Sequence, residues 1–486
     1  MTVRLLVLAP IVVGLALYLL PKSADRIAKW IGVAVAGFSV FAIAANAHAP
    51  DFAAHWLARP FDASFHLGYG PVSYWIVLLL ALSTFSALLA LRAPRARAYT
   101  AQMLVLEGAM AGVFLAKDVL LFALFWDLML IPVFLLMVGW GRAEGGHGHR
   151  TAAWRYLIYN LAGGLCLLLA TAAFGVVHGS TDVIGNARAN VAIGDVWGLW
   201  IFAGFAFAFL VKTPVFPFHT WMPDTYAELP APVVAVVSAV QSKAGLYGFI
   251  VIGVPFFGAQ MHRAVPLMFA LGIIALLYGA FVALTQFDAK RIVAYSSLSH
   301  LGLILIAIFS FDPIAFGGAA VYIVAHGLFS AALFITLGYV ESREDTRSLV
   351  RLGGLGHHNP KLAGALMLSA LAALGLPGLA GFAGELLILT GLFHAGFGAA
   401  ALVALVPIVI AAGYMLRLFQ TLMNGPKMAD LPERRDLSWV EGLALVPLVA
   451  AFILLGVNPG PVAAPASAPG VSFEFNGGAH AAGAIR

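Results

Sequence analysis

The sequence predicts an all-α polytopic membrane protein, and three observations carry this prediction. Hydrophobic residues make up 62% of the 486 residues and charged residues only 10%, far below the roughly 25% of a soluble domain. The mean hydropathy is +0.95. The apolar residues gather in runs of about 20, the length that crosses a hydrocarbon core about 30 Å thick. Long unbroken runs disfavour the alternating pattern of a β-barrel, and helices satisfy their backbone polar groups internally.

Fourteen such runs divide the chain, and the stretches between them are too short for a soluble domain. We expect the first run to stay as a helix because more positive charge follows it than precedes it, unlike a secretory signal. The tail from Pro461 onward is rich in Ala, Gly and Pro and is expected to be poorly ordered. The runs cover residues 3–21, 28–47, 71–91, 99–115, 118–140, 154–177, 193–222, 232–254, 264–286, 291–310, 313–341, 361–395, 397–424 and 437–457.

The basic residues indicate how the chain lies in the membrane. Loops after odd-numbered runs hold 18 Lys and Arg residues, and loops after even-numbered runs hold four. The positive-inside bias therefore predicts that the odd-numbered loops face the cytoplasm and that both termini lie on the opposite side. Because the basic residues sit between apolar runs, the net charge of +5 indicates a lipid bilayer as partner and no nucleic acid.

Composition and motifs exclude several chemistries. Cys166 is the only cysteine and lies in an apolar run, so the chain can form no internal disulfide, zinc ribbon or cysteine-ligated iron–sulfur cluster. The sequence has no G-x-G-x-x-G after a strand and no G-x-x-x-x-G-K-[ST], so no nucleotide site is predicted. We expect no metal and no cofactor in this chain, and an energy source in a gradient or a partner subunit.

Two runs are interrupted by helix-breaking residues, VKTPVFPFHTWMP (211–223) in the seventh and LGLPGLAGFAGE (374–385) in the twelfth. Discontinuous helices near mid-membrane mark ion pathways in transporters. Since the breaks lie five runs apart, repeats of five helices would have opposite membrane orientations. The predicted division is therefore helices 1–3 (1–98), a first five-helix repeat (99–255), an inverted second repeat (256–425), and helix 14 with a flexible tail (426–486).

Few ionisable residues lie inside the runs, and a charge at the bilayer centre costs from about 2.5 kcal/mol upward, so each is a functional candidate. Burial disfavours the charged form of a lone carboxylate at position 127, and a lysine near it would restore that form. Histidine titrates near neutral pH, which suits a proton relay. The main candidates are Asp127, Lys212, Lys243 and Glu385, and the lower-ranked relay candidates are His300, His326, Glu107 and His219.

Each candidate also has a structural interpretation. The aspartate and lysines could form static buried ion pairs, but such pairs stabilise weakly, which favours function. Glu385 could cap the half-helix after the glycines. Glu107 could reach the interface or pair locally, and each histidine could be a packing residue, with His219 nearest an interface. Arg417 is expected to extend its head to the lipid headgroups.

Four segments together resemble signature segments of the antiporter-like subunits of respiratory NADH:quinone oxidoreductase. The resemblance covers about residues 68–425, and the histidine in SSLSHLG is most similar to the subunit M type. The segments are VKTPVFPFHTWMPDTYAELPAP, FDAKRIVAYSSLSHLGLILIAI, AHGLFSAALFITLGYVESREDTRSLVRLGGL and LGLPGLAGFAGELLIL.

The resemblance implies a subunit of a proton-translocating enzyme complex in the bacterial inner membrane, with both termini periplasmic. It implies fourteen helices with two inverted five-helix repeats, and a place in the membrane arm beside other antiporter-like subunits. Proton transfer would be coupled to distant quinone reduction. Flavin, iron–sulfur clusters and quinone are expected in partner subunits.

Residue by residue, the glutamate of the family's W-E motif falls on Asp127, its two lysines fall on Lys212 and Lys243, and its acid in the twelfth span falls on Glu385. Aspartate is one methylene shorter than glutamate, which leaves its distance to Lys212 open; a bridging water could compensate. The hypothesis is that a proton enters from the cytoplasm toward Lys243, crosses by waters and histidines to Glu385 and leaves on the opposite side. Asp127 and Lys212 would act as the gate.

Two alternatives stay open. The same helical module occurs in multi-subunit Na⁺/H⁺ antiporters and membrane-bound hydrogenases, so the chain could belong to one of these. It could also be a scaffold subunit that completes a membrane arm without pumping, and the aspartate at position 127 keeps that interpretation open.

Overall fold

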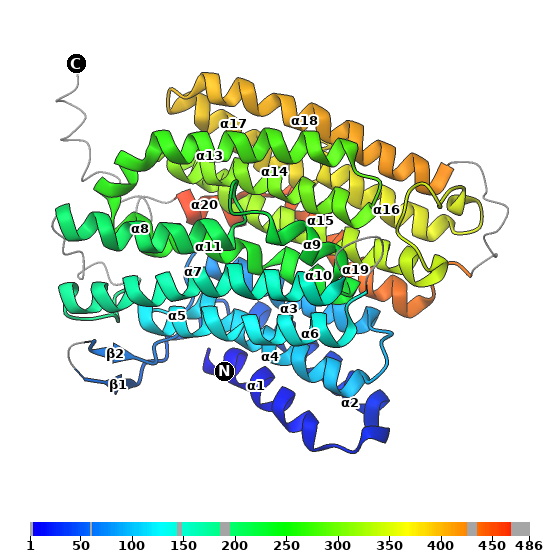
Figure 1. Cartoon of the computed structure of the whole chain (residues 1–486), viewed down its shortest axis with the longest axis horizontal. Helices are drawn as coiled ribbons and strands as arrows, with labels where there is room; N and C mark the ends of the chain where they lie inside the picture. The colour runs from blue at the N-terminus through cyan, green and yellow to red at the C-terminus, as the bar shows by residue number, and fades with distance from the viewer. Residues whose placement is uncertain (1–2, 59–60, 143–147, 185–194, 425–434, 468–486) are drawn as a thin grey trace.

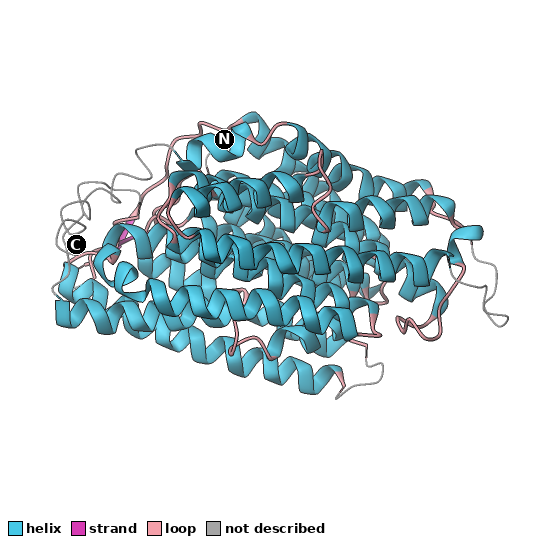
Figure 2. Ribbon diagram, turned by 90° about the horizontal axis from the view of Figure 1, so that it is seen from above, coloured by secondary structure: helices cyan, strands magenta, loops and turns pink. Residues whose placement is uncertain are grey.

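The computed structural model describes residues 3–58, 61–142, 148–184, 195–424 and 435–467. Most of this chain is helical, and the helices lie side by side along the long axis of the molecule (Figure 1). Loops gather at the helix ends, and the one short β-hairpin of the described chain lies at one of these ends (Figure 2). The arrangement is the one a bilayer demands, because helices leave few backbone polar groups unpaired in lipid.

The helices and strands follow one another in two groups. The first contains α1 (Arg4–Ala16), α2 (Asp25–Ala45), β1 (His55–Leu57), β2 (Ala63–Ser64), α3 (Ser73–Ala90), α4 (Ala96–Leu115), α5 (Val119–Leu128), α6 (Leu130–Trp140), α7 (His149–His178), α8 (Asp195–Lys212), α9 (Trp221–Glu228), α10 (Ala231–Ala239), α11 (Ala244–Gly248) and α12 (Val254–Phe256). The second contains α13 (Gly258–Thr285), α14 (Ala289–Phe309), α15 (Pro313–Glu344), α16 (Pro360–Ala373), α17 (Ala380–His394), α18 (Gly398–Phe419), α19 (Trp439–Val457) and α20 (Gly460–Ser467).

The described chain has 11 helical segments that are long and apolar enough to cross a membrane. Four shorter apolar helices accompany them, at Arg4–Leu19, Val196–Lys212, Pro360–Ala373 and Ala380–His394. The prediction of a mostly helical, multi-pass membrane protein is confirmed. The number of fourteen spans stays a prediction.

Local sequence determines where several helices begin. The side chains of Asp118, Asp288, Asp312 and Ser438 accept hydrogen bonds from the first free amides of α5, α14, α15 and α19. Such caps are favourable because the first four amides of a helix have no partner within it. Each of these helices therefore starts at a position that the sequence marks.

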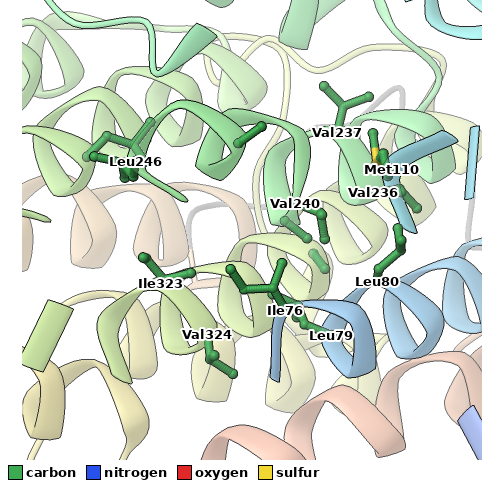
Figure 3. Close-up of a cluster of buried hydrophobic side chains, with 14 of the residues drawn as sticks. Ile76, Leu79, Leu80, Met110, Val236, Val237, Val240, Leu246, Ile323 and Val324 are labelled. Carbon is green, nitrogen blue, oxygen red and sulfur yellow. The ribbon is translucent and has the colours of Figure 1, made fainter. Parts of the chain in front are cut away.

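The centre of the molecule is formed by α14 and α15. The membrane-crossing stretch of α15 is 100% buried and that of α14 is 94% buried, whereas that of α19 is 28% buried. Side chains from α3, α4, α10, α11 and α15 interlock in this core (Figure 3). The central helices carry His300 and His326, so protein and not lipid surrounds these two side chains.

The structure corrects one expectation and refines two others. The prediction of a poorly ordered tail from Pro461 onward is wrong for its first residues, because helix α20 forms over Gly460–Ser467. Its side chains Val462 and Ala466 are buried, and α20 packs against α15. Residues 468–486 lie outside the described chain. The predicted eighth span is interrupted at Val240, so that Lys243 stands in a tight turn between α10 and α11. Arg417 donates to the carbonyls of Leu284 and Gln286 at the end of α13, which places its head on a helix end.

A loop between α2 and α3 carries the antiparallel pair β1–β2 and is tied to the segment after α7. The ring of His66 lies with Nδ1 2.6 Å from Asp182 Oδ1 and Nε2 3.6 Å from Asp51 Oδ2. The hydrogen bond to Asp182 raises the pKa of His66 above its ordinary value, with burial opposing this effect. The protonated ring therefore holds the two segments together.

This link predicts a pH-dependent loop. A raised pKa means that the stabilisation is fully present below the ordinary histidine pKa of about 6.5 and is lost as pH rises through the raised value. Limited proteolysis of the assembled complex should cleave the segment 46–72 faster at high pH. A His66→Gln variant should be cleaved equally fast at low and high pH, and His55→Gln, at an exposed ring, should behave as the parent. A parent cleavage rate that does not change with pH would refute the link.

Candidate functional site

The candidate residues lie on helices that the fold brings into its interior. Lys212 ends α8, and Lys243 follows α10; His300 lies on α14, His326 on α15 and Glu385 on α17. All five side chains are at most 6% exposed. Burying so many polar groups is costly unless they find partners, so their partners indicate what the site can do.

Asp127 and Lys212 face one another without forming an ion pair in this structure. The Lys212 Nζ and the Asp127 Oδ1 have no hydrogen-bond partner among the described residues, although the two side chains interact electrostatically. The ammonium lies 4.9 Å from the ring centroid of Trp126, an arrangement that attracts a cation to the aromatic face. The two charged groups therefore have no direct bond to one another.

A glycine makes room for the Asp127 carboxylate. A Cβ atom at Gly164 on α7 would lie 1.9 Å from Asp127 Oδ1, closer than any side chain can approach. Asp127 lies at the junction of α5 and α6. The Asp127 carboxylate therefore packs against the backbone of Gly164, and no side chain from that position limits its movement.

Lys243 is bound to a histidine of the central helix. Its Nζ lies 2.6 Å from His326 Nδ1 and also donates to the Ser238 carbonyl. Because an ammonium only donates, His326 Nδ1 accepts and its proton resides on Nε2. The His326 Nε2 has no partner among the described residues, so this proton is available for onward transfer.

His300 is connected to Glu385 through a tyrosine. The Tyr322 hydroxyl donates to Glu385 Oε1 at 2.6 Å and lies 2.5 Å from His300 Nδ1. A hydroxyl that donates to a carboxylate must accept from the ring, so His300 carries its proton on Nδ1. The His300 Nε2 then accepts from the Ser296 hydroxyl at 3.0 Å, and Ser296 accepts from Tyr414 at 3.1 Å.

The two hydrogen-bonded groups meet at their histidines. The ring centroids of His300 and His326 lie 5.5 Å apart with an angle of 60° between the planes. One ring rotation or one water molecule spans that distance. Lys243, His326, His300, Tyr322 and Glu385 therefore form an almost continuous row of proton-carrying groups, which we call the relay row.

The carboxylate of Glu385 also depends on a glycine, because a Cβ at Gly375, whose φ is +78°, would lie 2.2 Å from Glu385 Oε2. The start of α17 receives no side-chain cap, and Glu385 bonds instead to Tyr322 on α15. The break between α16 and α17 thus brings the acid against α15.

The remaining candidates lie apart from the relay row. Glu107 on α4 is 2% exposed and borders a cavity of about 10 Å³ beside Ser39 on α2, space for about one water. His219 lies in the stretch between α8 and α9, with its ring 5.0 Å from that of Tyr278 and 5.5 Å from that of Phe216. Within the described chain, neither residue has a hydrogen bond or an ion pair to the relay row.

Sequence reasoning missed the hydroxyl groups that complete the relay row. Tyr322 precedes His326 by four residues and Ser296 precedes His300 by four, so each pair shares a helix face. This spacing was visible in the sequence. Polar residues four positions apart are common in helices, so the spacing alone did not single these residues out. It also does not show that the Tyr322 hydroxyl reaches Glu385, which lies 63 residues away in the chain.

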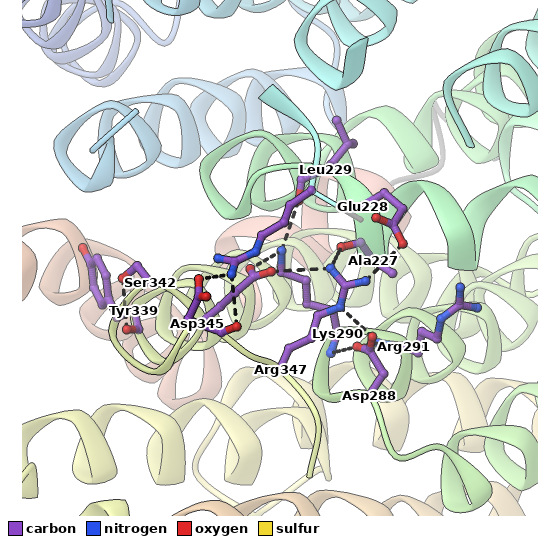
Figure 4. A network of polar contacts seen from close by, with 12 residues as sticks. Ala227, Glu228, Leu229, Asp288, Lys290, Arg291, Tyr339, Ser342, Asp345 and Arg347 are labelled. Carbon is purple, nitrogen blue, oxygen red and sulfur yellow. Dashed lines mark hydrogen bonds and ion pairs between the residues drawn. The ribbon is translucent and has the colours of Figure 1, made fainter. Parts of the chain in front are cut away.

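It also missed a cluster of buried charges at one end of the central helices (Figure 4). Arg347, in the loop after α15, is ion-paired at once with Glu228, Asp288 and Glu341, and Lys290 is ion-paired with Glu341. We call these five residues the Arg347 cluster. From the sequence, Lys290 and Arg347 counted only among the loop charges that indicate membrane orientation, and the three acids were not singled out.

These features define a polytopic membrane protein with a polar path through its helical core. The chain belongs to the NADH:quinone oxidoreductase/Mrp antiporter membrane family, whose model matches residues 116–411. It is 34% identical to NADH-quinone oxidoreductase subunit M of Mycobacterium tuberculosis, over 94% of this chain and 90% of the relative. It is 30% identical to subunit M of Escherichia coli, over 94% of each chain.

Solved structures share the fold. A chain of respiratory complex I from Thermus thermophilus matches with a TM-score of 0.88 and 29% identity, over 98% of this chain and 99% of that chain. A chain of the Mrp complex from Dietzia sp. matches with a TM-score of 0.85 and 22% identity, over 97% of this chain and 98% of that chain. The fold thus occurs in multi-subunit membrane complexes.

Proposed function

We propose that this chain is a proton-translocating membrane-arm subunit of an NADH:quinone oxidoreductase. Its similarity to subunit M sequences along nearly its whole length supports the enzyme complex. The relay row supports the proton-carrying role, and it is the single observation that carries the proposal. Electron transfer would take place in partner subunits, and this chain would contribute only the proton path.

The row suggests a direction for each step. A proton arriving from the cytoplasm is taken up near Lys243, whose ammonium donates to His326 Nδ1. His326 then releases its Nε2 proton to His300 Nε2, which gives up its hydrogen bond from Ser296 to accept it. From His300 Nδ1 the proton passes to the Tyr322 oxygen while the tyrosine gives its own proton to Glu385. Each transfer occurs between atoms at hydrogen-bond distance, apart from the step between the two histidines.

Asp127 and Lys212 would act as the gate of this path. When the carboxylate approaches, it stabilises the charged lysine; when it withdraws, the buried ammonium favours release of a proton. The two groups are separated in this structure. Moving one charge against 100 mV takes about 2.3 kcal/mol, which corresponds to fewer than two pKa units at about 1.4 kcal/mol each. A small movement of this pair is therefore sufficient.

The finer topology belongs to the same proposal. We infer fourteen spans, with two inverted five-helix repeats over 99–255 and 256–425 and both termini on the periplasmic side. The interruptions after Lys212 and between Ala373 and Ala380 occupy corresponding places in the two repeats. The neighbours would be other antiporter-like subunits of the membrane arm.

A multi-subunit Na⁺/H⁺ antiporter remains the second candidate because the Mrp chain shares the fold. Its likeness at 22% identity concerns the fold alone. Sodium dependence separates the two functions: pumping driven by NADH and quinone in sodium-free buffer supports the first, and strict dependence on sodium supports the second.

The gate is tested by Lys212→Ala and Asp127→Ala in the complete complex in membrane vesicles energised with NADH and quinone. Proton pumping and coupled NADH oxidation should fall by about tenfold or more, since removing either group leaves the other buried charge without the counter-charge that the gate needs, which costs several kcal/mol. Lys361→Ala, at an exposed lysine, and Asp127→Glu should pump as the parent. If both alanine variants assemble and pump normally, the proposal that Asp127 and Lys212 form a gate is wrong, and the result favours the interpretation of the chain as a scaffold subunit.

A further inference from the structure

Arg347 is bound in three directions at once. Its Nε donates to Asp288 Oδ2 at 2.6 Å, its Nη1 to the Ala227 carbonyl at 2.6 Å and its Nη2 to Glu228 Oε1 at 3.1 Å. The side chain is 2% exposed. Figure 4 shows the guanidinium of Arg347 between the end of α9 and Asp288 at the start of α14. A planar five-donor head suits such a junction, and a lysine does not replace it.

A second cation ties the same turn to the same helices. Lys290 Nζ lies 2.5 Å from Glu341 Oε2 near the end of α15 and donates to the Leu229 carbonyl at 3.1 Å. Glu341 is shared, because its Oε1 lies 3.4 Å from Arg347 Nη1. The end of α9 and Leu229, which together lead into α10, are therefore fixed to α14 and α15 by two buried cations.

All three helices lead from this end to the relay row. Lys243 follows Leu229 by 14 residues, His300 follows Asp288 by 12, and His326 precedes Glu341 by 15. The bond between Lys243 and His326 lies just beyond the last residue of α10, and the bonds of the Arg347 cluster lie just before its first residue, at Leu229 and the end of α9. Both sets of bonds reach α15, through His326 and Glu341. The cluster is the cytoplasmic end in the proposed topology.

Between these two ends the helices touch through small apolar groups. A Cβ at Gly338 would lie 2.1 Å from the Ala231 side chain, and a Cβ at Gly327 would lie 2.8 Å from the Ala239 carbonyl. Such contacts permit close approach but resist sliding less than directional bonds do. A slide of one residue is about 1.5 Å, enough to lengthen the 2.6 Å contact of Lys243 and His326 and to tilt it away from the linear geometry that a strong hydrogen bond needs.

The charges of the Arg347 cluster do not suit proton transfer. Arginine keeps its proton in proteins, and ion pairs join both cations to carboxylates. A permanently charged group with several hydrogen bonds can fix the position of the segments around it, but it cannot donate and accept a proton in turn. Its effect on the relay row must therefore act through the helices.

We propose that Arg347 is a positioning residue that fixes the register of α10 on α15 and thereby aligns Lys243 with His326. The inference rests on the proposed function of the relay row. It assigns to a loop arginine a role in proton transfer roughly 20 Å away, by helix rise.

The test compares Arg347→Lys and Arg347→Met with the parent in the complete complex, with assembly checked and Arg351→Met as control. Arg351 lies four residues further along the same loop, with an exposed side chain. The lysine variant keeps a cation among the three acids, so it should assemble even if the methionine variant does not. Proton pumping should slow about tenfold, the factor that corresponds to roughly 1.4 kcal/mol, a value typical of one hydrogen bond.

The solvent isotope effect separates positioning from simple destabilisation. If the relay is misaligned, proton transfer limits the rate, and pumping by Arg347→Lys should slow markedly more in D₂O than pumping by the parent. An assembled lysine variant with the parent rate and isotope effect would overturn the inference. Lys243→Met, measured in parallel, tests the proposed function itself: if that variant pumps normally, the relay fails, whatever the result at Arg347.

Discussion

Replacing Lys243 by methionine should abolish proton transfer through this subunit. Methionine fills a similar volume but leaves His326 Nδ1 without the donor that it has at 2.6 Å, and it removes the one ammonium bonded to the relay row within the described chain. General acid–base groups contribute about 10²–10⁴-fold to a rate. Because Lys243→Met removes a proton-carrying group completely, we expect the pumping rate to fall by a factor at the upper end of that range. The measurement is proton uptake per NADH oxidised in vesicles that hold the assembled complex.

Lys243→Arg is the matched variant because it keeps the charge. Arginine does not release its proton in proteins, so this variant should assemble as well as the parent and still fail to pump. If Lys243→Arg pumps at the parent rate, the residue supplies only charge and the proposed proton transfer at this position is wrong. If both variants pump normally, the relay row carries no protons.

Replacing Tyr322 by phenylalanine should have the next largest effect. The ring stays in the core, where Tyr322 is completely buried, but the hydroxyl that joins His300 Nδ1 to Glu385 Oε1 is removed. We expect proton pumping to fall about a hundredfold, the lower end of the acid–base range. The fall should appear in the pumping rate measured with saturating NADH and quinone.

Tyr247→Phe provides the control for lost stability. Tyr247 is also buried and donates to the Phe114 carbonyl at 2.9 Å, so its loss removes one buried hydrogen bond, worth about 1 kcal/mol, outside the relay row. It should lower thermal stability, as Tyr322→Phe should, and leave pumping at the parent rate. Equal losses of pumping in both variants would show that Tyr322 acts through packing alone.

Part of the site could be predicted because it is visible as charge in an apolar run. A lysine at position 243 or an acid at position 385 is costly in a membrane, and each stands out from its neighbours. Lys243 and Glu385 do lie on one row of bonded groups, whereas Glu107 and His219, chosen by the same rule, lie apart from it. The rule finds unusual residues but does not say which of them meet.

The partners were harder to predict because neutral hydroxyl groups cost little in a helix. Tyr322 and Ser296 do not stand out from other polar residues, and their importance comes from contacts with other helices. Arg347 was misread for the opposite reason. Basic residues in loops report membrane orientation, and nothing local shows that this one turns inward to three acids.

The sequence by itself determined the class of the protein: hydropathy, run length and the positions of the breaks follow from local composition, and a bilayer accepts few other folds for such a chain. It also determined which charges must be buried, because the apolar runs enclose them. Only the tertiary structure decided that Lys212 and Asp127 stand apart, that Tyr322 joins His300 to Glu385, and that Arg347 holds the turn after α9. Those contacts depend on how helices distant in sequence pack together, and packing is set by the whole core and not by any single segment.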